Sequence, residues 1–259
     1  MALEPIIVSL LLSFGLNGLI YILAFTFQTD KLTDGTYSAT FLLIAWYLFK
    51  QGEPQYYRII IAAMVSLWAV RLGGYLAYRI FKKGRDVRFD QMRPVWWRFG
   101  GFWLLQAVSV WIISLPFVIA LGQSGTAVYE AQSKAALTIG VILFLIGWLI
   151  EWRADAQKSK FKSNALNQNQ LITTGLYNWV RFPNYLGEIL VWVGIFISCI
   201  PVLEGWQWLS IISPLWIIYL LTRISGIPLL IEVQDKKYGQ QEAYKNYIKK
   251  TKKLVPRVY

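Results

Sequence analysis

The sequence predicts an all-α integral membrane protein of about seven transmembrane helices, arranged as one polytopic membrane domain over residues 1–259. Three observations predict this class. Hydrophobic residues make up 56% of the chain, and they are grouped in segments close to the length of a membrane span. The 13 Trp and 15 Tyr residues are typical of helices that are anchored at membrane interfaces. Lys and Arg residues gather in alternate connections between the apolar segments.

Seven apolar segments approach the roughly 20 residues that a membrane-spanning helix needs. The second segment is the shortest. The first lacks the basic leading region and the small-residue cleavage site of a signal peptide, so we expect it to be a membrane helix. In chain order, the expected helices are Pro5–Gln28, Thr36–Phe49, Tyr56–Phe81, Phe99–Gly122, Ala135–Trp152, Pro183–Cys199 and Leu209–Ile231. The glycine pairs at 73–74 and 100–101 lie inside these segments and indicate close helix packing.

Basic residues predict the orientation of the helices. Seven Lys or Arg residues lie between Arg79 and Arg98, five lie between the fifth and sixth segments, and eight follow the seventh. The opposite connections carry only Lys50, Arg58 and Lys134. Because basic loops stay in the cytosol, the N-terminus is expected outside and the C-terminus inside. The net charge of +12 then reflects these loops and contact with anionic membrane lipid, and we expect no nucleic-acid partner.

Polar residues within the predicted helices share one depth, in the cytosolic half. Because polar groups inside a bilayer are costly, each is a functional candidate. Some recur at a spacing of four residues and therefore share a helix face, as Glu151 and Asp155 do, and as Asn184 and Glu188 do. Such groups can hold the hydroxyls, amides and phosphates of a cofactor, or they can pair only with one another and fix helix packing. The set is Asp34, Arg71, Tyr75, Tyr78, Gln106, Glu151, Asp155, Asn184, Glu188, Arg223 and Glu232.

The residue inventory excludes several kinds of site. Histidine is absent and Cys199 is the one cysteine, so we expect no metal, haem or iron–sulfur centre and no disulfide within the chain. No glycine-rich dinucleotide fingerprint and no phosphate loop occur. Any nucleotide would therefore be held by side chains from several helices and from the basic loops.

The segment TGLYNWVRFPNYLGEILVWVG, Thr174–Gly194, resembles the C-terminal region of the steroid 5α-reductase family (3-oxo-5α-steroid 4-dehydrogenase-like). More narrowly, it resembles the bacterial branch formerly known as a domain of unknown function, DUF1295. Three further segments are similar to that family: EWRADAQKSKFK at Glu151–Lys162, LAYRIFKKGRD at Leu76–Asp86 and FWLLQA at Phe102–Ala107. The tail from Gly226 also resembles that of the branch, so the likeness covers roughly residues 30 to 259.

The resemblance implies an NADPH-dependent reductase that transfers hydride to the carbon β to a ketone in an α,β-unsaturated lipid. Carried over by position, the cofactor-binding residues would be Tyr78, Arg85, Glu151, Asp155, Lys162, Asn184 and Glu188. The catalytic positions depart from the family, because Arg71 stands where the steroid enzymes have a tyrosine. Arg71 could stabilise an enolate directly, Tyr75 could supply the proton, and Asp34 is the candidate acid of the second helix and a candidate partner of Arg71.

Two other classes stay open at this stage. Membrane methyltransferases that use S-adenosylmethionine share an R-x-P-x-Y-x-G motif, which RFPNYLG at Arg181–Gly187 fits, although they usually have histidine where this chain has Phe182. The other class is a non-enzymatic protein, such as a transporter or a lipid-binding scaffold. A transporter would have polar residues near the midplane, which the one-sided polar depth argues against. We expect a lipophilic small-molecule substrate and a bacterial inner (plasma) membrane location; the sequence does not indicate the oligomeric state.

Overall fold

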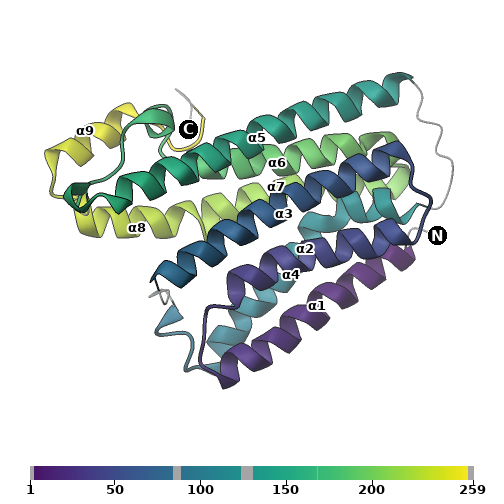
Figure 1. Ribbon diagram of the computed structural model, residues 1–259, viewed down its shortest axis with the longest axis horizontal. Coiled ribbons are helices and arrows are strands. Elements are labelled where there is room, and N and C mark those ends of the chain that lie inside the picture. The colour runs from purple at the N-terminus through teal and green to yellow at the C-terminus, as the bar shows by residue number, and fades with distance from the viewer. Residues whose placement is uncertain (1–2, 84–88, 124–130, 168, 256–259) are drawn as a thin grey trace. The chain divides into compact units, whose positions relative to one another are not determined.

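The computed structural model describes residues 3–83, 89–123, 131–167 and 169–255 (Figure 1). In these ranges the protein is built from helices, and the one β-bridge pairs Val180 with Lys252. This confirms the predicted all-α membrane fold. The α-helices of the described residues are α1 (Leu3–Thr26), α2 (Thr33–Lys50), α3 (Tyr56–Lys83), α4 (Trp96–Gly122), α5 (Ala131–Ser163), α6 (Pro183–Cys199), α7 (Ile212–Tyr219), α8 (Ile227–Tyr238) and α9 (Glu242–Lys250).

The helices form two compact units. The first unit contains Met1–Val141 and Ile195–Ser213, and the second contains Ile142–Gly194 and Pro214–Tyr259. Helices α5 and α6 each contribute to both units. The expectation of one membrane domain over the whole chain stays a prediction.

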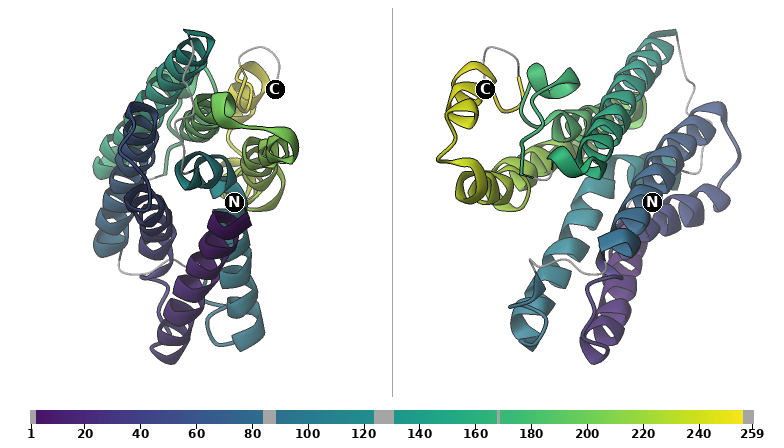
Figure 2. Two further views of the ribbon diagram at one scale, coloured as in Figure 1. Left: turned by 90° about the vertical axis from the view of Figure 1, so that its right-hand side faces the viewer. Right: turned by 60° about the vertical axis from the view of Figure 1, so that its left-hand side comes forward.

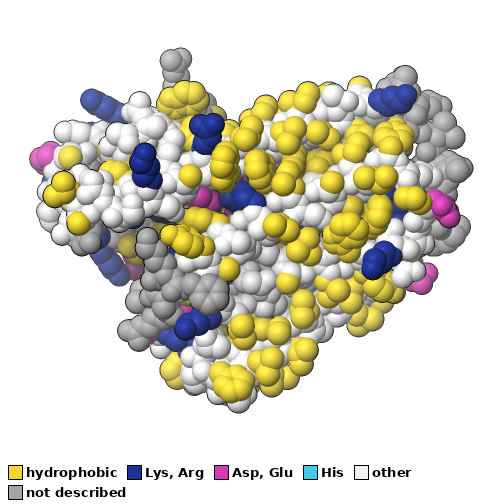
Figure 3. All heavy atoms as spheres, viewed as in Figure 1, with side chains coloured by type: hydrophobic (Ala, Val, Ile, Leu, Met, Phe, Trp, Pro, Cys, Tyr) yellow, Lys and Arg dark blue, Asp and Glu magenta, His cyan; other side chains and the backbone are white. Residues whose placement is uncertain are grey.

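Six helical segments of the described residues are long and apolar enough to cross a membrane. They correspond to six of the seven predicted spans, and α6 begins and ends as predicted. The seventh predicted span is α2, whose 18 residues include several polar side chains. Helix α5 continues beyond the predicted end at Trp152, as far as Ser163. Figure 3 shows hydrophobic side chains spread along the helices on the visible face, as expected for contact with lipid.

In the first unit, the buried face of α1 is polar. Ser9, Ser13 and Asn17 recur at every fourth position and are buried, whereas apolar residues such as Leu3 and Leu11 are exposed. A helix of a soluble protein shows the opposite pattern. In a membrane, small and polar residues pack helix against helix while apolar side chains meet lipid. Figure 2 shows α1 alongside α4, against which it packs.

Hydrogen bonds join this polar face to α2 and α4. The Gln106 Nε2 atom donates to Asn17 Oδ1 at 2.9 Å and to the Thr33 carbonyl at 3.3 Å. In turn, Asn17 Nδ2 donates to the Ser13 carbonyl at 2.8 Å and to Thr40 Oγ1 at 3.4 Å. Bonds of this kind each stabilise helix association in membranes by about 0.6–2 kcal/mol. Gln106 therefore takes part in helix packing, which is one of the two roles expected for the polar residues.

Arg58 joins the C-terminal ends of two helices. Its guanidinium is buried and donates to the carbonyls of Leu48 and Phe49 in α2, each at 3.0 Å. It also donates to the carbonyl of Leu121 in α4 and to that of Gln123, just beyond α4, the latter at 3.0 Å. Helix C-termini leave carbonyls without helical partners and carry partial negative charge, so one buried cation satisfies both helix ends.

The opposite end of α2 is also tied to α3. Asp34, in the first turn of α2, forms an ion pair with Arg79 near the end of α3, with 3.0 Å between Oδ2 and Nη2. Since Arg58 lies at the start of α3, α2 runs antiparallel to α3 with a polar contact at each end. An 18-residue helix is about 27 Å long, close to the thickness of the hydrocarbon core.

In the second unit, the last predicted span is interrupted. The structure has α7, a π-helical turn at Leu220–Ile224 (η6) and α8 in place of one helix over Leu209–Ile231. Gly226 lies at the break, where an added Cβ would be 2.8 Å from the Leu221 carbonyl oxygen and 3.2 Å from the Tyr185 ring. Pro228 in the first turn of α8 has no N–H to continue the preceding helix. The predicted span is therefore confirmed by its length and hydropathy, but its helix is interrupted at residues 220–226.

Candidate functional site

The motif that precedes α6 is held against the end of α5. Gly175 has a positive φ of 64°, and an added Cβ would lie 2.6 Å from Gln157 Oε1. That same oxygen accepts a hydrogen bond from the Leu176 backbone N–H at 3.0 Å. The Tyr177 hydroxyl donates to the Ala154 carbonyl at 3.3 Å. A glycine is needed here because only glycine combines this φ with such a close approach of a neighbouring side chain.

A second close approach joins α5 to α6. Gly147 and Gly187 face each other, and a Cβ added to either residue would lie 2.6 Å from the carbonyl oxygen of the other. A Cβ on Gly187 would also lie 2.7 Å from the Glu151 nitrogen. The crossing therefore brings the backbone of Glu151 against the residue that directly precedes Glu188.

This crossing gathers four of the predicted site residues. Glu151 and Asp155 are buried on α5, with 3% and 7% of their surface exposed. Asn184 and Glu188 lie half-buried on the first two turns of α6. The arrangement places carboxylates and a carboxamide at one helix crossing. These groups can accept hydrogen bonds from hydroxyls, and the carboxamide can also donate to a carbonyl or phosphate oxygen.

Lys162, a predicted phosphate ligand, makes contacts within the protein. Its ammonium donates to the Gln170 carbonyl at 2.8 Å and to the Tyr238 hydroxyl at 3.2 Å. It also lies 5.8 Å from the centre of the Tyr238 ring. The side chain links the end of α5 to the following loop and to α8. Its exposed position leaves donor capacity for a further anion, because an ammonium has three N–H groups.

Sequence reasoning missed the anchoring of the motif by α9. The Tyr247 hydroxyl donates to the Tyr177 carbonyl at 2.6 Å, and the Tyr244 hydroxyl donates to Asp235. Arg181 Nη2 lies 3.5 Å from the Tyr244 hydroxyl oxygen. Burial raises the pKa of Tyr244 and of Tyr247 to about 12. The three-residue spacing of two tyrosines in a lysine-rich helix was the available signal.

The predicted catalytic residues lie in the first unit, on α2 and α3. Arg71 and Tyr75 are half-buried one turn apart on α3, while Tyr78 is exposed. Asp34 was a candidate partner of Arg71, but its carboxylate pairs with Arg79, two turns further along α3. The pairing with Arg79 corrects the expected contact of Asp34 with Arg71. It follows from the packing register of α2 against α3. Arg85, predicted to bind the cofactor, lies outside the described residues.

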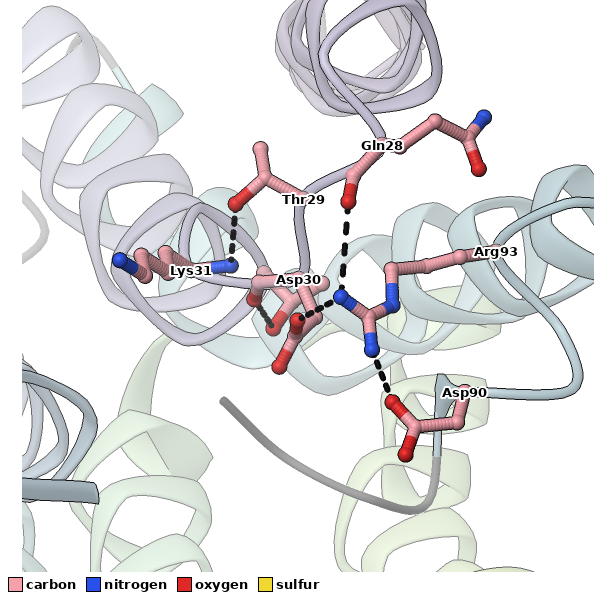
Figure 4. A network of polar contacts seen from close by, with 7 residues as sticks. Gln28, Thr29, Asp30, Lys31, Asp90 and Arg93 are labelled. Carbon is pink, nitrogen blue, oxygen red and sulfur yellow. Dashed lines mark hydrogen bonds and ion pairs between the residues drawn. The ribbon is translucent and has the colours of Figure 1, made fainter. Parts of the chain in front are cut away.

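A further ion-pair network ties two connections of the first unit together (Figure 4). Arg93, which precedes α4, pairs with Asp30 at 3.0 Å and with Asp90. Its Nη1 also lies 3.4 Å from the Gln28 carbonyl oxygen, in the turn after α1. The Asp30 side chain is only 1% exposed, so Arg93 supplies the counter-charge that its burial requires. The network holds the α1–α2 turn to the segment before α4.

Comparison with known proteins places the chain in a family. The family described as Protein of unknown function (DUF1295) matches residues 20–251, which is most of the sequence. The chain belongs to this family. An uncharacterized protein of Schizosaccharomyces pombe is 25% identical to this DUF1295 protein over 229 residues, covering 75% of the chain. The aligned part spans 64% of that relative's own length. No solved structure matches the chain.

Proposed function

We propose that this DUF1295 protein is an NADPH-dependent membrane reductase that acts on an enone-type lipid. The observation that carries the proposal is the α5–α6 crossing at Gly147 and Gly187. It gathers two buried acids, Glu151 and Asp155, beside the turn that bears Asn184 and Glu188. Carboxylates accept hydrogen bonds from hydroxyl and amide N–H groups, and a nicotinamide nucleotide offers both in its ribose hydroxyls and its carboxamide.

The donor set fits such a cofactor by its chemistry. Asn184 can both donate to and accept from a carboxamide, and Asp155 can accept from a ribose hydroxyl. Lys162 can meet a phosphate, because an ammonium is a common phosphate ligand. When bound, NADPH would supply the hydride. We expect NADPH to bind more tightly than NADH, since its additional phosphate can interact with the basic residues in the last turns of α5, Lys158, Lys160 and Lys162.

The proposed reaction adds two hydrogens across the carbon–carbon double bond of the lipid. Hydride goes to the carbon β to the ketone, negative charge develops on the ketone oxygen, and a proton then goes to the α carbon. Arg71 is proposed to stabilise the oxygen with its fixed positive charge, and Tyr75 is proposed to donate the proton. Because Asp34 pairs with Arg79, we assign Asp34 a role in holding Arg79 in place and leave proton donation to Tyr75.

The Arg71 assignment is tested by substitution. Arg71→Met should lower turnover roughly 100-fold or more, with little change in the NADPH dissociation constant. The matched variant Arg79→Met removes the same charge from α3 and breaks the Asp34 pair. A variant at Arg71 that melts early, but retains its turnover per folded molecule, would show that Arg71 serves the fold.

The cofactor class is tested by binding to the purified, full-length protein. Isothermal titration of NADPH, NADH and S-adenosylmethionine should give binding of NADPH and no binding of S-adenosylmethionine. The motif RFPNYLG at Arg181–Gly187 is also similar to that of membrane methyltransferases. If the protein binds S-adenosylmethionine and does not bind NADPH, the reductase proposal is contradicted. A methyltransferase that acts on a lipid or on a lipid-modified substrate would then be favoured.

A further inference from the structure

The end of α9 carries a group of cations without acidic partners among the described residues. Lys249 and Lys250 occupy the last turn of the helix, and Lys252 follows it; all three are exposed. Elsewhere in the same region the acids are already engaged. Glu232 pairs with Lys236 at 2.6 Å, and Glu242 pairs with Lys245 at 3.2 Å. A concentrated positive charge therefore remains at one end of α9.

These lysines are held in place by the opposite face of α9. Tyr244 and Tyr247 are buried and bond to α8 and to the motif before α6, as described above. The segment after the helix is fixed too, because the Arg181 N–H donates to the Lys252 carbonyl at 2.8 Å. These contacts hold the lysine-bearing end of α9 in a fixed position. Figure 3 shows separate Lys or Arg side chains at the surface in the region of α9.

An aromatic side chain lies near these lysines. Trp179 is 70% exposed, and its neighbour Val180 forms the β-bridge with Lys252. An exposed indole next to lysines is typical of the interface between lipid tails and head groups, where the ring is amphipathic and the cations meet phosphates. Helix α9 begins at Glu242, soon after Tyr238, where the last segment that is long and apolar enough to cross a membrane ends. Because the nine residues of α9 are too few to cross a membrane, the lysines at its end lie on the side of the membrane where that segment ends.

We propose that the α9 platform, defined as Trp179, Lys249, Lys250 and Lys252, binds the head groups of anionic phospholipids. Each lysine close to an anionic membrane surface contributes roughly a fivefold increase in affinity, which salt weakens. The platform would retain anionic lipid around the second unit. This inference does not depend on which cofactor the protein uses.

The test measures which lipid lies next to Trp179. The full-length protein is reconstituted in nanodiscs of phosphatidylcholine containing a minor fraction of phosphatidylglycerol, with either lipid brominated to quench tryptophan. Subtracting the signal of Trp179→Phe isolates the quenching of Trp179 from that of the other tryptophans. Brominated phosphatidylglycerol should quench Trp179 more strongly than its bulk fraction predicts, and added salt should reduce the excess.

A matched pair of double variants separates this platform from general positive charge. Lys249→Gln with Lys250→Gln should reduce the excess of phosphatidylglycerol about tenfold or more. Lys236→Gln with Lys245→Gln removes the same number of charges from paired lysines and should leave the excess nearly intact. The proposal would be overturned if the quenching of Trp179 in the wild-type protein followed the bulk lipid composition. It would also be overturned if both double variants lost the excess of phosphatidylglycerol equally. Loss of NADPH binding with unchanged lipid preference would also overturn it, because the lysines would then serve the cofactor.

Discussion

Gly147 and Gly187 face each other so closely that a Cβ on either residue would lie 2.6 Å from the carbonyl oxygen of the other. This contact lets α5 and α6 approach at backbone distance, and it positions Glu151 beside the turn that carries Asn184 and Glu188. Membrane helices depend on such small residues for close packing, because lipid tails provide no hydrophobic force that drives helices together. The proposed cofactor site therefore depends on the close contact between these two glycines.

We expect Gly187→Ala and Gly147→Ala each to destabilise the protein. The added methyl group cannot be accommodated without separating the helices, and overpacking of this kind costs about 1–3 kcal/mol. Thermal unfolding in detergent measures the loss. Gly101→Ala is the control, because Gly101 has no heavy atom within 4 Å of an added Cβ. Equal melting temperatures for Gly187→Ala and Gly101→Ala would show that the close approach does not exist in solution.

Arg58 offers a second test, in the first unit. Replacing it with Met leaves carbonyls at the ends of α2 and α4 without their buried donor, which should cost about 3 kcal/mol or more. Arg58→Lys should keep only part of this stability, because an ammonium cannot reproduce the planar set of N–H donors of a guanidinium. Lys50→Gln removes an exposed charge from the same helix end and should change the melting temperature little. A small loss of stability in Arg58→Met would contradict the capping role of Arg58.

The topology depends on whether α2 crosses the membrane. The native Cys199 is buried, so cysteines introduced at exposed positions on either side of α2 can be labelled against a low background. In intact cells an impermeant maleimide should label Gln51→Cys and should reach Lys31→Cys only after permeabilisation. The reason is that basic loops stay in the cytosol, and that α2 lies antiparallel to α3 with contacts to both Arg58 and Arg79. Labelling of both cysteines from the same side would mean that α2 does not cross.

The tyrosines of α9 predict a loss of stability at high pH. A tyrosine in the unfolded chain ionises near its ordinary pKa of 10.0, whereas folding raises the pKa of Tyr247 to about 12. The stabilising effect of the neutral form is therefore complete below pH 10 and is lost as the pH rises toward 12. Melting temperatures between pH 9 and pH 11.5 should fall more steeply for the wild-type protein than for Tyr247→Phe. Parallel curves would show that Tyr247 has an ordinary pKa.

The sequence predicted the helices well because hydrophobic length is a local property. It correctly predicted α6 from Pro183 to Cys199, and its expectation of the other spans was close apart from two differences. The polar extension of α5 was missed because hydropathy stops at Trp152 although no helix breaker follows before Asn164. The break at Gly226 was missed because Pro228 was read as part of one apolar run.

Contacts between helices were harder to predict, since they depend on packing register. Asp34 was expected to meet Arg71 and instead meets Arg79. Arg58 was counted only as a loop charge, because its carbonyl partners are far away in sequence. Of the glycine pairs expected at close helix contacts, Gly73 lies against Ser38 and Gly100 against Tyr21, but the contact of backbone with backbone at Gly147 and Gly187 was not predicted. Single glycines in apolar helices give no pattern by which to identify their partners.

The proposed site is tested most directly by the affinity of the folded protein for NADPH when the α6 turn is changed. Removing one hydrogen-bonding group should weaken binding about tenfold or more, so Asn184→Ala and Glu188→Ala should raise the dissociation constant by that factor. Glu232→Ala, which removes an exposed acid paired with Lys236, should bind NADPH as the wild-type protein does. Melting temperatures near that of the wild type would confirm that the variants are folded. Unchanged NADPH affinity in folded Asn184→Ala and Glu188→Ala would contradict a cofactor site at the α5–α6 crossing.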